Sequence, residues 1–249
     1  MGGHSHWAGI KHKKALVDAK RGKVFTRLIR EITIAARLGG GSPDGNPRLR
    51  KAIDDGKAAN MPTENVKRAI QRGTGELPGV TYEELVYEGY GPGGIAVLCE
   101  ATTDNKNRTT SEIRRLFSQH GGNLGESGCV AWMFQSRGYL TVRKDKADEE
   151  LLMNLVLEFG AEDLRTQEPE VYEIITSPQD FEKVRSGLAQ RRIPVESSEL
   201  TFLPQSEVQV GEKEAPRVLV LMDALEEHED VKNVYSNFNI PDEILRRSP

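Results

Sequence analysis

Residues 139–203 alternate between strand-like and helix-like segments, and this order limits the possible folds more than any other feature. Short runs rich in β-branched and aromatic residues are separated by two segments, 146–159 and 178–191, in which apolar residues recur every three or four positions. Asp145 and Ser177 precede these two segments and are suitable N-caps. The order is strand, helix, strand, strand, helix, strand, which predicts a ferredoxin-like unit.

A second set of strand and helix patterns precedes this unit. Strand patterns at 85–90 and 95–101 flank the turn sequence Gly91-Pro92-Gly93-Gly94. A helical pattern at 105–120 and a strand pattern at 129–134 follow. This part therefore reads as strand, strand, helix, strand, and lacks one helix and one strand of a complete unit.

The missing helix and strand are found near the end of the chain, at 215–227 and 232–238. We therefore predict one discontinuous α+β domain into which a ferredoxin-like domain is inserted, followed by a short tail. The expected bounds are 79–134 and 205–240 for the discontinuous domain, 135–204 for the inserted domain and 241–249 for the tail.

Residues 1–78 have no strand pattern and predict a basic helical domain with an arm. Residues 1–22 are polar and basic, so we expect this arm to be mobile without a partner. Of the three helices that follow, the first ends at glycines 39–41, the second starts at the N-cap Asn46, and the third follows Pro62. The fold class is therefore α+β, with an N-terminal three-helix domain followed by two ferredoxin-like α/β sandwich domains, one inserted into the other.

Charge is divided unevenly along the chain. Residues 1–75 contain 16 Lys and Arg against 6 Asp and Glu, a net charge of +10, whereas the rest contains 18 against 32, a net charge of −14. On the first helix the basic residues gather opposite the apolar face, and acids are nearly absent there. Such a face is typical of proteins that bind a polyanion, because each neutralised phosphate releases condensed counterions.

These basic residues are the candidate nucleic-acid-binding site, and we expect Lys23, Arg27 and Arg30 to be exposed. Trp7 can either stack on a base or anchor the arm onto the helices, and both interpretations stay open. The candidates are Trp7, Lys11, Lys13, Lys14, Lys20, Lys23, Arg27, Arg30, Arg48, Arg50, Lys51, Lys67, Arg68 and Arg72.

Enzymatic chemistry has little support in the sequence. There is no Walker A sequence, no Gly-x-Ser-x-Gly and no suitable pair of a His and a nucleophile. The histidines lack partners at metal-ligand spacing, and we interpret Cys99 and Cys129 as buried thiols in a reducing compartment. We therefore predict no enzyme activity, no catalytic residues, no metal, no cofactor and no small-molecule substrate.

The longest apolar runs are far shorter than a membrane span, and the N-terminus has no apolar signal region. We therefore expect a cytoplasmic protein without a membrane partner.

A polar segment precedes the helical pattern at 105–120, and a glycine-rich segment follows it at 121–128. In one interpretation Asp104 or Asn105 is simply the N-cap of that helix. In the other, the two segments form a polar groove for an RNA or protein partner, with Asp104, Asn105, Lys106, Asn107 and Arg108 as candidate residues.

Several multi-residue motifs, spread over essentially the whole chain, resemble the YebC/PmpR family. They are Gly3-His4-Ser5-His6-Trp7-Ala8-Gly9-Ile10-Lys11-His12-Lys13-Lys14, Asp18-Ala19-Lys20-Arg21-Gly22-Lys23, Asn46-Pro47-Arg48-Leu49-Arg50, Lys57-Ala58-Ala59-Asn60-Met61-Pro62, Thr103-Asp104-Asn105-Lys106-Asn107-Arg108-Thr109 and Gly122-Asn123-Leu124-Gly125. His6 departs from the family pattern, in which a Lys is expected.

The resemblance implies a three-domain bacterial cytoplasmic protein that binds DNA and regulates transcription. Relatives include a mitochondrial translational activator, and bacterial members are linked to ribosomes. The first hypothesis is therefore a DNA-binding transcriptional regulator, and the alternative is a ribosome-associated translation factor that binds rRNA or tRNA with the same basic face. No helix presents an obvious set of base-reading residues, so the sequence supports phosphate contacts rather than base-specific ones.

Overall fold

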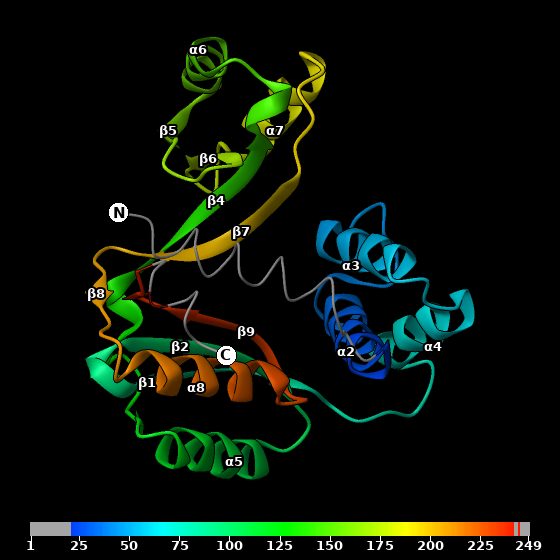
Figure 1. Ribbon diagram of the computed structural model, residues 1–249. Helices are drawn as coiled ribbons and strands as arrows, with labels where there is room; N and C mark the ends of the chain where they lie inside the picture. The colour runs from blue at the N-terminus through cyan, green and yellow to red at the C-terminus, as the bar shows by residue number, and fades with distance from the viewer. Residues whose placement is uncertain (1–20, 242–243, 245–249) are drawn as a thin grey trace.

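The computed structural model describes residues 21–241 and residue 244, and these form three parts (Figure 1). A helical unit, coloured blue to cyan, lies beside two antiparallel sheets, so the expected α+β class is confirmed. The helices of this unit are α2 (Arg21–Gly39), α3 (Pro47–Ala58) and α4 (Thr63–Thr74).

The helical unit has an apolar core of its own. Residues at helical spacing on each helix, as the periodicity predicts, are buried against one another. Their buried members are Ile32, Ala35, Ala36, Leu49, Ala52, Met61, Val66 and Ala69.

Asn46 fixes the corner between α2 and α3. Its Oδ1 accepts a hydrogen bond from the Leu49 N–H at 3.0 Å, and its Nδ2 donates to the carbonyls of Ala35 (2.7 Å) and Gly40 (2.9 Å). The predicted N-cap is therefore confirmed, and Pro47 occupies the first helical position, where no N–H is needed.

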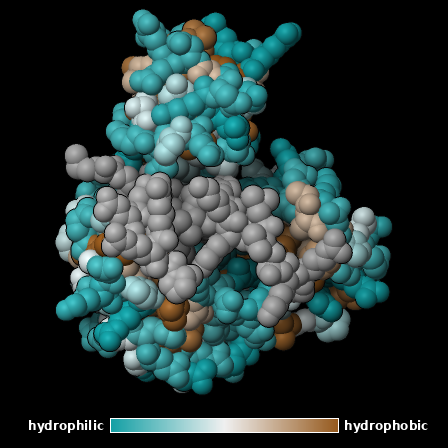
Figure 2. Space-filling model, in the orientation of Figure 1, coloured by the Kyte–Doolittle hydropathy of each residue, from teal (hydrophilic) through white to brown (hydrophobic). Residues whose placement is uncertain are grey.

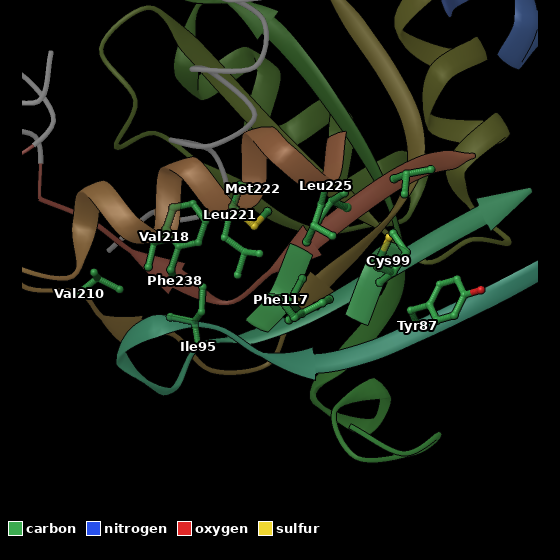
Figure 3. Packing of buried hydrophobic residues seen from close by; sticks show 14 of the residues in the cluster. Tyr87, Ile95, Cys99, Phe117, Val210, Val218, Leu221, Met222, Leu225 and Phe238 are labelled. Carbon is green, nitrogen blue, oxygen red and sulfur yellow. The ribbon is translucent and has the colours of Figure 1, made fainter. Parts of the chain in front are cut away.

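The first sheet combines strands from distant parts of the chain, in the order β3-β1-β2-β9. Side chains of α5 (Lys106–Gln119) and α8 (Ala215–Glu227) point toward one face of this sheet (Figure 3). In β2, Val97 and Cys99 face these helices, whereas Ala96 and Leu98 pack toward the second sheet. The strands are β1 (Glu83–Tyr90), β2 (Ala96–Thr103), β3 (Asn123–Leu124) and β9 (Val231–Ser236).

The second sheet has the order β5-β6-β4-β7, which is the ferredoxin-like order predicted for this stretch. Helices α6 (Glu149–Phe159) and α7 (Phe181–Gln190) pack against it around a single apolar core. Its strands are β4 (Phe134–Arg143), β5 (Ala161–Arg165), β6 (Val171–Thr176) and β7 (Ser197–Pro204). This arrangement supports an inserted domain, and the bounds at 79, 135, 205 and 241 stay predictions.

Short elements complete the fold. Strands β8 (Val208–Gln209) and β10 (Phe238–Asn239) pair in parallel. The described residues also include the 3-10 helices η1 (Pro92–Gly94), η2 (Ala131–Met133) and η3 (Lys144–Lys146).

The predicted strand at 129–134 is wrong, because η2 takes its place and β4 begins only at Phe134. The carboxylate of Glu88 accepts hydrogen bonds from the N–H groups of Gly128 (2.7 Å), Val130 (2.9 Å) and Ala131 (2.7 Å). These bonds curl the backbone around one anion, which a ladder of paired strands does not allow.

The predicted cap of α6 is also wrong. Asp148, not Asp145, accepts the hydrogen bond from the Leu151 N–H, at 3.0 Å. Asp145 instead pairs with Arg143 at 2.9 Å, one short turn before the helix starts.

Apolar contacts join the two sheets, but within the described ranges no buried apolar cluster joins the helical unit to them. The connecting residues 75–81 are all exposed. On the face in Figure 2, hydrophilic residues predominate and hydrophobic ones are scattered. The position of the helical unit therefore depends on polar contacts.

Candidate nucleic-acid interface

The basic candidates that the structure describes all lie in the helical unit, on α2, α3 and α4. Five further candidates lie outside the described residues: Trp7, Lys11, Lys13, Lys14 and Lys20.

The predicted exposure of the basic face of α2 is wrong for Arg30, whose exposed fraction is 8%. Its Nη1 lies 2.8 Å from Oδ1 of Asp230 and donates to the Glu229 carbonyl at 2.7 Å. Its guanidinium also stacks on the Tyr82 ring, 5.7 Å from the centroid. A helical wheel describes one helix alone and cannot show which element packs on its polar side.

Lys23 and Arg27 of the same face contact the end of α8. Lys23 Nζ donates to the Glu227 carbonyl at 2.8 Å, and Arg27 Nη2 donates to the carbonyls of Glu226 and His228, the latter at 3.2 Å. The last carbonyls of a helix carry partial negative charge and lack intrahelical donors, so cations are favoured there. Burial lowers the pKa of Arg27, although the nearby Glu226 acts to raise it. Arg27 is thus half-buried, and of the three residues expected to be exposed only Lys23 is exposed.

Asp230 is the centre of this contact, and its exposed fraction is 1%. Its Oδ2 accepts hydrogen bonds from Arg108 Nη2 at 2.8 Å and Thr109 Oγ1 at 2.6 Å, while Oδ1 faces Arg30. Burial acts to raise the pKa of Asp230, but the bonds from Thr109 and Arg108 and the charge of Arg30 hold it below its ordinary value. One buried carboxylate therefore joins the helical unit to α5.

The polar motif at 103–109 builds the other side of this centre. Asn105 caps α5 by accepting the Arg108 N–H at 3.1 Å, so the N-cap interpretation is confirmed for Asn105. Arg108 also pairs with Asp104 at 3.1 Å. Lys106 and Asn107 are exposed, and their predicted role in binding a partner stays a prediction.

Arg48 is held by two carboxylates. Its Nε lies 2.7 Å from Glu31 Oε1, and its Nη2 lies 2.6 Å from Glu84 Oε1 on β1. Hydrogen bonds to Glu31 and Glu84 raise the pKa of Arg48 well above its ordinary value. Glu31 also accepts from Lys232 of β9 at 2.9 Å. The ion pairs of Arg48 thus form a second contact between the helical unit and the first sheet, and Arg48 is not an unpaired cation.

The remaining candidates are exposed on α3 and α4. Lys51 pairs with Asp55 and Arg68 with Glu64 one turn away, and Arg50 donates to loop carbonyls. Lys67 and Arg72 have no hydrogen-bond or ion-pair partner in the described part of the chain. Exposed pairs one turn apart contribute only about 0.3–0.5 kcal/mol each, so their cations are available to a stronger anion.

Arg37, near the end of α2, was not among the candidates, yet it is exposed and without a described partner. Helical periodicity places it on the basic face with Arg30, which is the signal that identifies it. No local signal identifies Asp230, Glu31 or Glu84 as partners of these cations.

Glu112, His228 and Asp230 lie close enough to suggest a metal site. His228 Nε2 is 2.9 Å from Glu112 Oε2, and His228 Nδ1 accepts the Asp230 N–H at 3.1 Å. Because two arginines neutralise Asp230 and both nitrogens of His228 form hydrogen bonds, we interpret this cluster as a hydrogen-bonded core rather than a metal site.

None of the helices in the described ranges is long and apolar enough to cross a membrane.

Comparison with known proteins agrees with this architecture. Residues 5–76 match the family model "TACO1/YebC protein N-terminal domain", and residues 82–238 match "TACO1/YebC second and third domain". A protein of Endomicrobium trichonymphae is 56% identical and one of Elusimicrobium minutum is 54% identical, each over 99% of both chains. Both are named "probable transcriptional regulatory protein".

The crystal structure of a conserved hypothetical protein from Aquifex aeolicus superposes with a TM-score of 0.83 at 53% identity. The match covers 96% of this chain and 99% of that one. The two matched family models cover most of the chain, and the relatives share its full length. The chain belongs to the TACO1/YebC family.

Proposed function

We propose that this protein is a DNA-binding transcriptional regulator that binds the phosphate backbone with exposed cations of α3 and α4. Relatives more than half identical to it carry the name "probable transcriptional regulatory protein". The proposed role is binding rather than catalysis, and we place it in the cytoplasm.

The observation that carries the proposal is the difference between two sets of cations. The first set has partners within the protein: Arg27 donates a hydrogen bond to a carbonyl, and Arg30 and Arg48 form ion pairs. Lys67, Arg72 and Arg37 are exposed without a described partner, and Lys51 and Arg68 are held only by exposed neighbours. A set of available cations on an otherwise acidic protein is the expected footprint of a polyphosphate ligand.

The arm adds charge to this footprint. Lys11, Lys13, Lys14 and Lys20 directly precede the helical unit in sequence, and Trp7 offers a ring for stacking on a base. We include these residues in the proposed interface on the basis of the sequence alone.

Fluorescence anisotropy with a labelled DNA duplex at several salt concentrations tests the proposal. The variant Lys51→Glu, Lys67→Glu and Arg68→Glu should weaken binding by about tenfold or more, and each lost phosphate contact should reduce the salt slope by about 0.9. The matched control reverses three exposed cations of the acidic part, Lys183→Glu, Lys213→Glu and Arg217→Glu, and should bind as the wild type does.

Equal affinity of the first variant and the wild type would exclude α3 and α4 as the interface. A structured RNA used as a competitor distinguishes the proposed function from the alternative, a translation factor that binds rRNA or tRNA. The regulator hypothesis requires that the duplex be bound at least as tightly as rRNA or tRNA fragments of equal length.

A further inference from the structure

A small pocket lies where α2, α4 and the connecting residues 75–82 meet. Its volume is about 150 Å³. Binding sites for whole small molecules usually have about 300–1,000 Å³, so this pocket fits one small group rather than a complete nucleotide. The residues that matter for its chemistry are Thr33, Arg37, Arg72, Leu77, Val80 and Tyr82.

The lining of the pocket carries positive charge only. Arg37 and Arg72 both line it, and none of its lining residues is acidic. Neither arginine has a partner in the described ranges, although Arg30 and Arg48 on the same helical unit each pair with a carboxylate. Two guanidinium groups at one cavity repel each other, and an anion placed there would remove that repulsion.

Three of the lining residues have backbone N–H groups without an acceptor among the described residues. Within the described residues, the N–H groups of Gly79, Val80 and Thr81 have no intramolecular acceptor, whereas the Leu77 N–H donates to the Gln71 carbonyl at 3.1 Å. Backbone N–H groups next to arginines are a common arrangement for holding phosphate oxygens.

Glycines let the walls of the pocket approach one another closely. A Cβ at Gly73 would lie 2.4 Å from the Thr33 carbonyl oxygen, so α4 contacts α2 with no room for a side chain. A Cβ at Gly79 would lie 3.2 Å from Arg72 Cγ, so the connection rests on the stem of Arg72. The backbone of α4 at Gly73 thereby lies close to the backbone of α2 at Arg37.

We propose that Arg37 and Arg72 form a phosphate site that clamps one backbone phosphate of bound nucleic acid. This proposal rests on the proposed function, since DNA supplies the phosphate. It adds a site of two arginines to an interface that is otherwise made of single exposed cations. A free phosphate ion has the same chemistry, and the experiment must therefore separate the two sources.

The test uses the full chain with Arg37→Gln and Arg72→Gln, which leaves Lys51, Lys67 and Arg68 unchanged. Duplex affinity should fall by about tenfold or more, and the salt slope should fall by about 0.9, as for one phosphate. The control is Arg185→Gln with Arg192→Gln, two cations of the second sheet's domain, and it should leave both quantities unchanged. The unfolding temperature checks the fold, and the single variant Arg37→Gln replaces the double variant if the latter is unfolded.

Wild-type affinity and slope in the Arg37→Gln, Arg72→Gln variant would overturn the clamp while leaving the proposed function intact. Inorganic phosphate is the second probe. If the wild type does not bind the duplex, but phosphate raises its unfolding temperature and not that of the variant, the pocket holds a free ion and the clamp is wrong. If the wild type binds neither probe, the proposed function fails as well.

Discussion

Arg30 Nη1 lies 2.8 Å from Asp230 Oδ1, and this buried ion pair joins the first described helix to the residue that precedes the last strand of the first sheet. The pair is supported on one side by Arg108 and Thr109 and on the other by the carbonyl of Glu229, two residues after the end of α8. Since no apolar cluster of the described residues spans this junction, these charges decide where the helical unit sits.

Asp230→Asn should lower the free energy of unfolding by about 3–5 kcal/mol, because two arginines would lose their buried countercharge while the shape of the side chain is kept. Urea unfolding followed by circular dichroism measures the change. Asp104→Asn is the control: it removes an exposed partner of Arg108 and should cost at most about 1 kcal/mol. Equal costs for the two substitutions would contradict the central role of Asp230.

Acid should weaken the same pair. The pKa of Asp230 is held below its ordinary value, so the folded state favours the carboxylate. Its contribution is present above the unfolded pKa of about 3.9 and is lost as the pH falls through the lower folded value. The difference in unfolding free energy between the wild type and Asp230→Asn should therefore be constant between about pH 5 and 7 and shrink below about pH 4. A difference that grows in acid would contradict this assignment.

Charge reversal on α2 should change the arrangement of the domains and not only the proposed nucleic-acid interface. Lys23→Glu, Arg27→Glu and Arg30→Glu together place carboxylates against Asp230 and the last carbonyls of α8, which are repelled. We expect the helical unit to keep its own core but to separate from the sheets. Small-angle scattering should show a larger radius of gyration, and the free energy of unfolding should fall by more than about 3 kcal/mol.

The matched variant Lys51→Glu, Lys67→Glu and Arg68→Glu should keep the wild-type radius, since these side chains are exposed on α3 and α4. If both variants keep the wild-type radius and stability, the contact between α2 and α8 does not hold the helical unit in place.

Glu88→Gln should loosen the segment between β3 and β4. The carboxylate binds three backbone N–H groups, and although burial acts to raise the pKa of Glu88, these bonds keep it below its ordinary value. A neutral amide oxygen binds them more weakly, at a cost of about 1–3 kcal/mol. Hydrogen exchange should become faster at Gly128, Val130 and Ala131. Glu126→Gln, at an exposed position in the same segment, should leave exchange unchanged.

Local patterns determined the elements themselves. The apolar period of α2, the cap formed by Asn46 and the strand and helix order of residues 139–203 are short-range features, since helix and strand geometry relates residues only a few positions apart. The sequence therefore predicted the fold class, and it showed that the excess of basic residues lies in residues 1–75. The prediction of a strand at 129–134 was wrong because the backbone there bends around the carboxylate of Glu88. Glu88 lies on another strand, so no local pattern could indicate this bend.

The partner of each cation was decided only by the tertiary structure. Lys67 and Arg30 have the same local signature, a basic residue on the polar face of a basic helix. Packing buries Arg30 against Asp230, which is distant in sequence, and leaves Lys67 exposed. The physical reason is that an ion pair depends on which elements are brought within a few ångströms, and this is set by the packing of whole domains rather than by the spacing of residues along one helix.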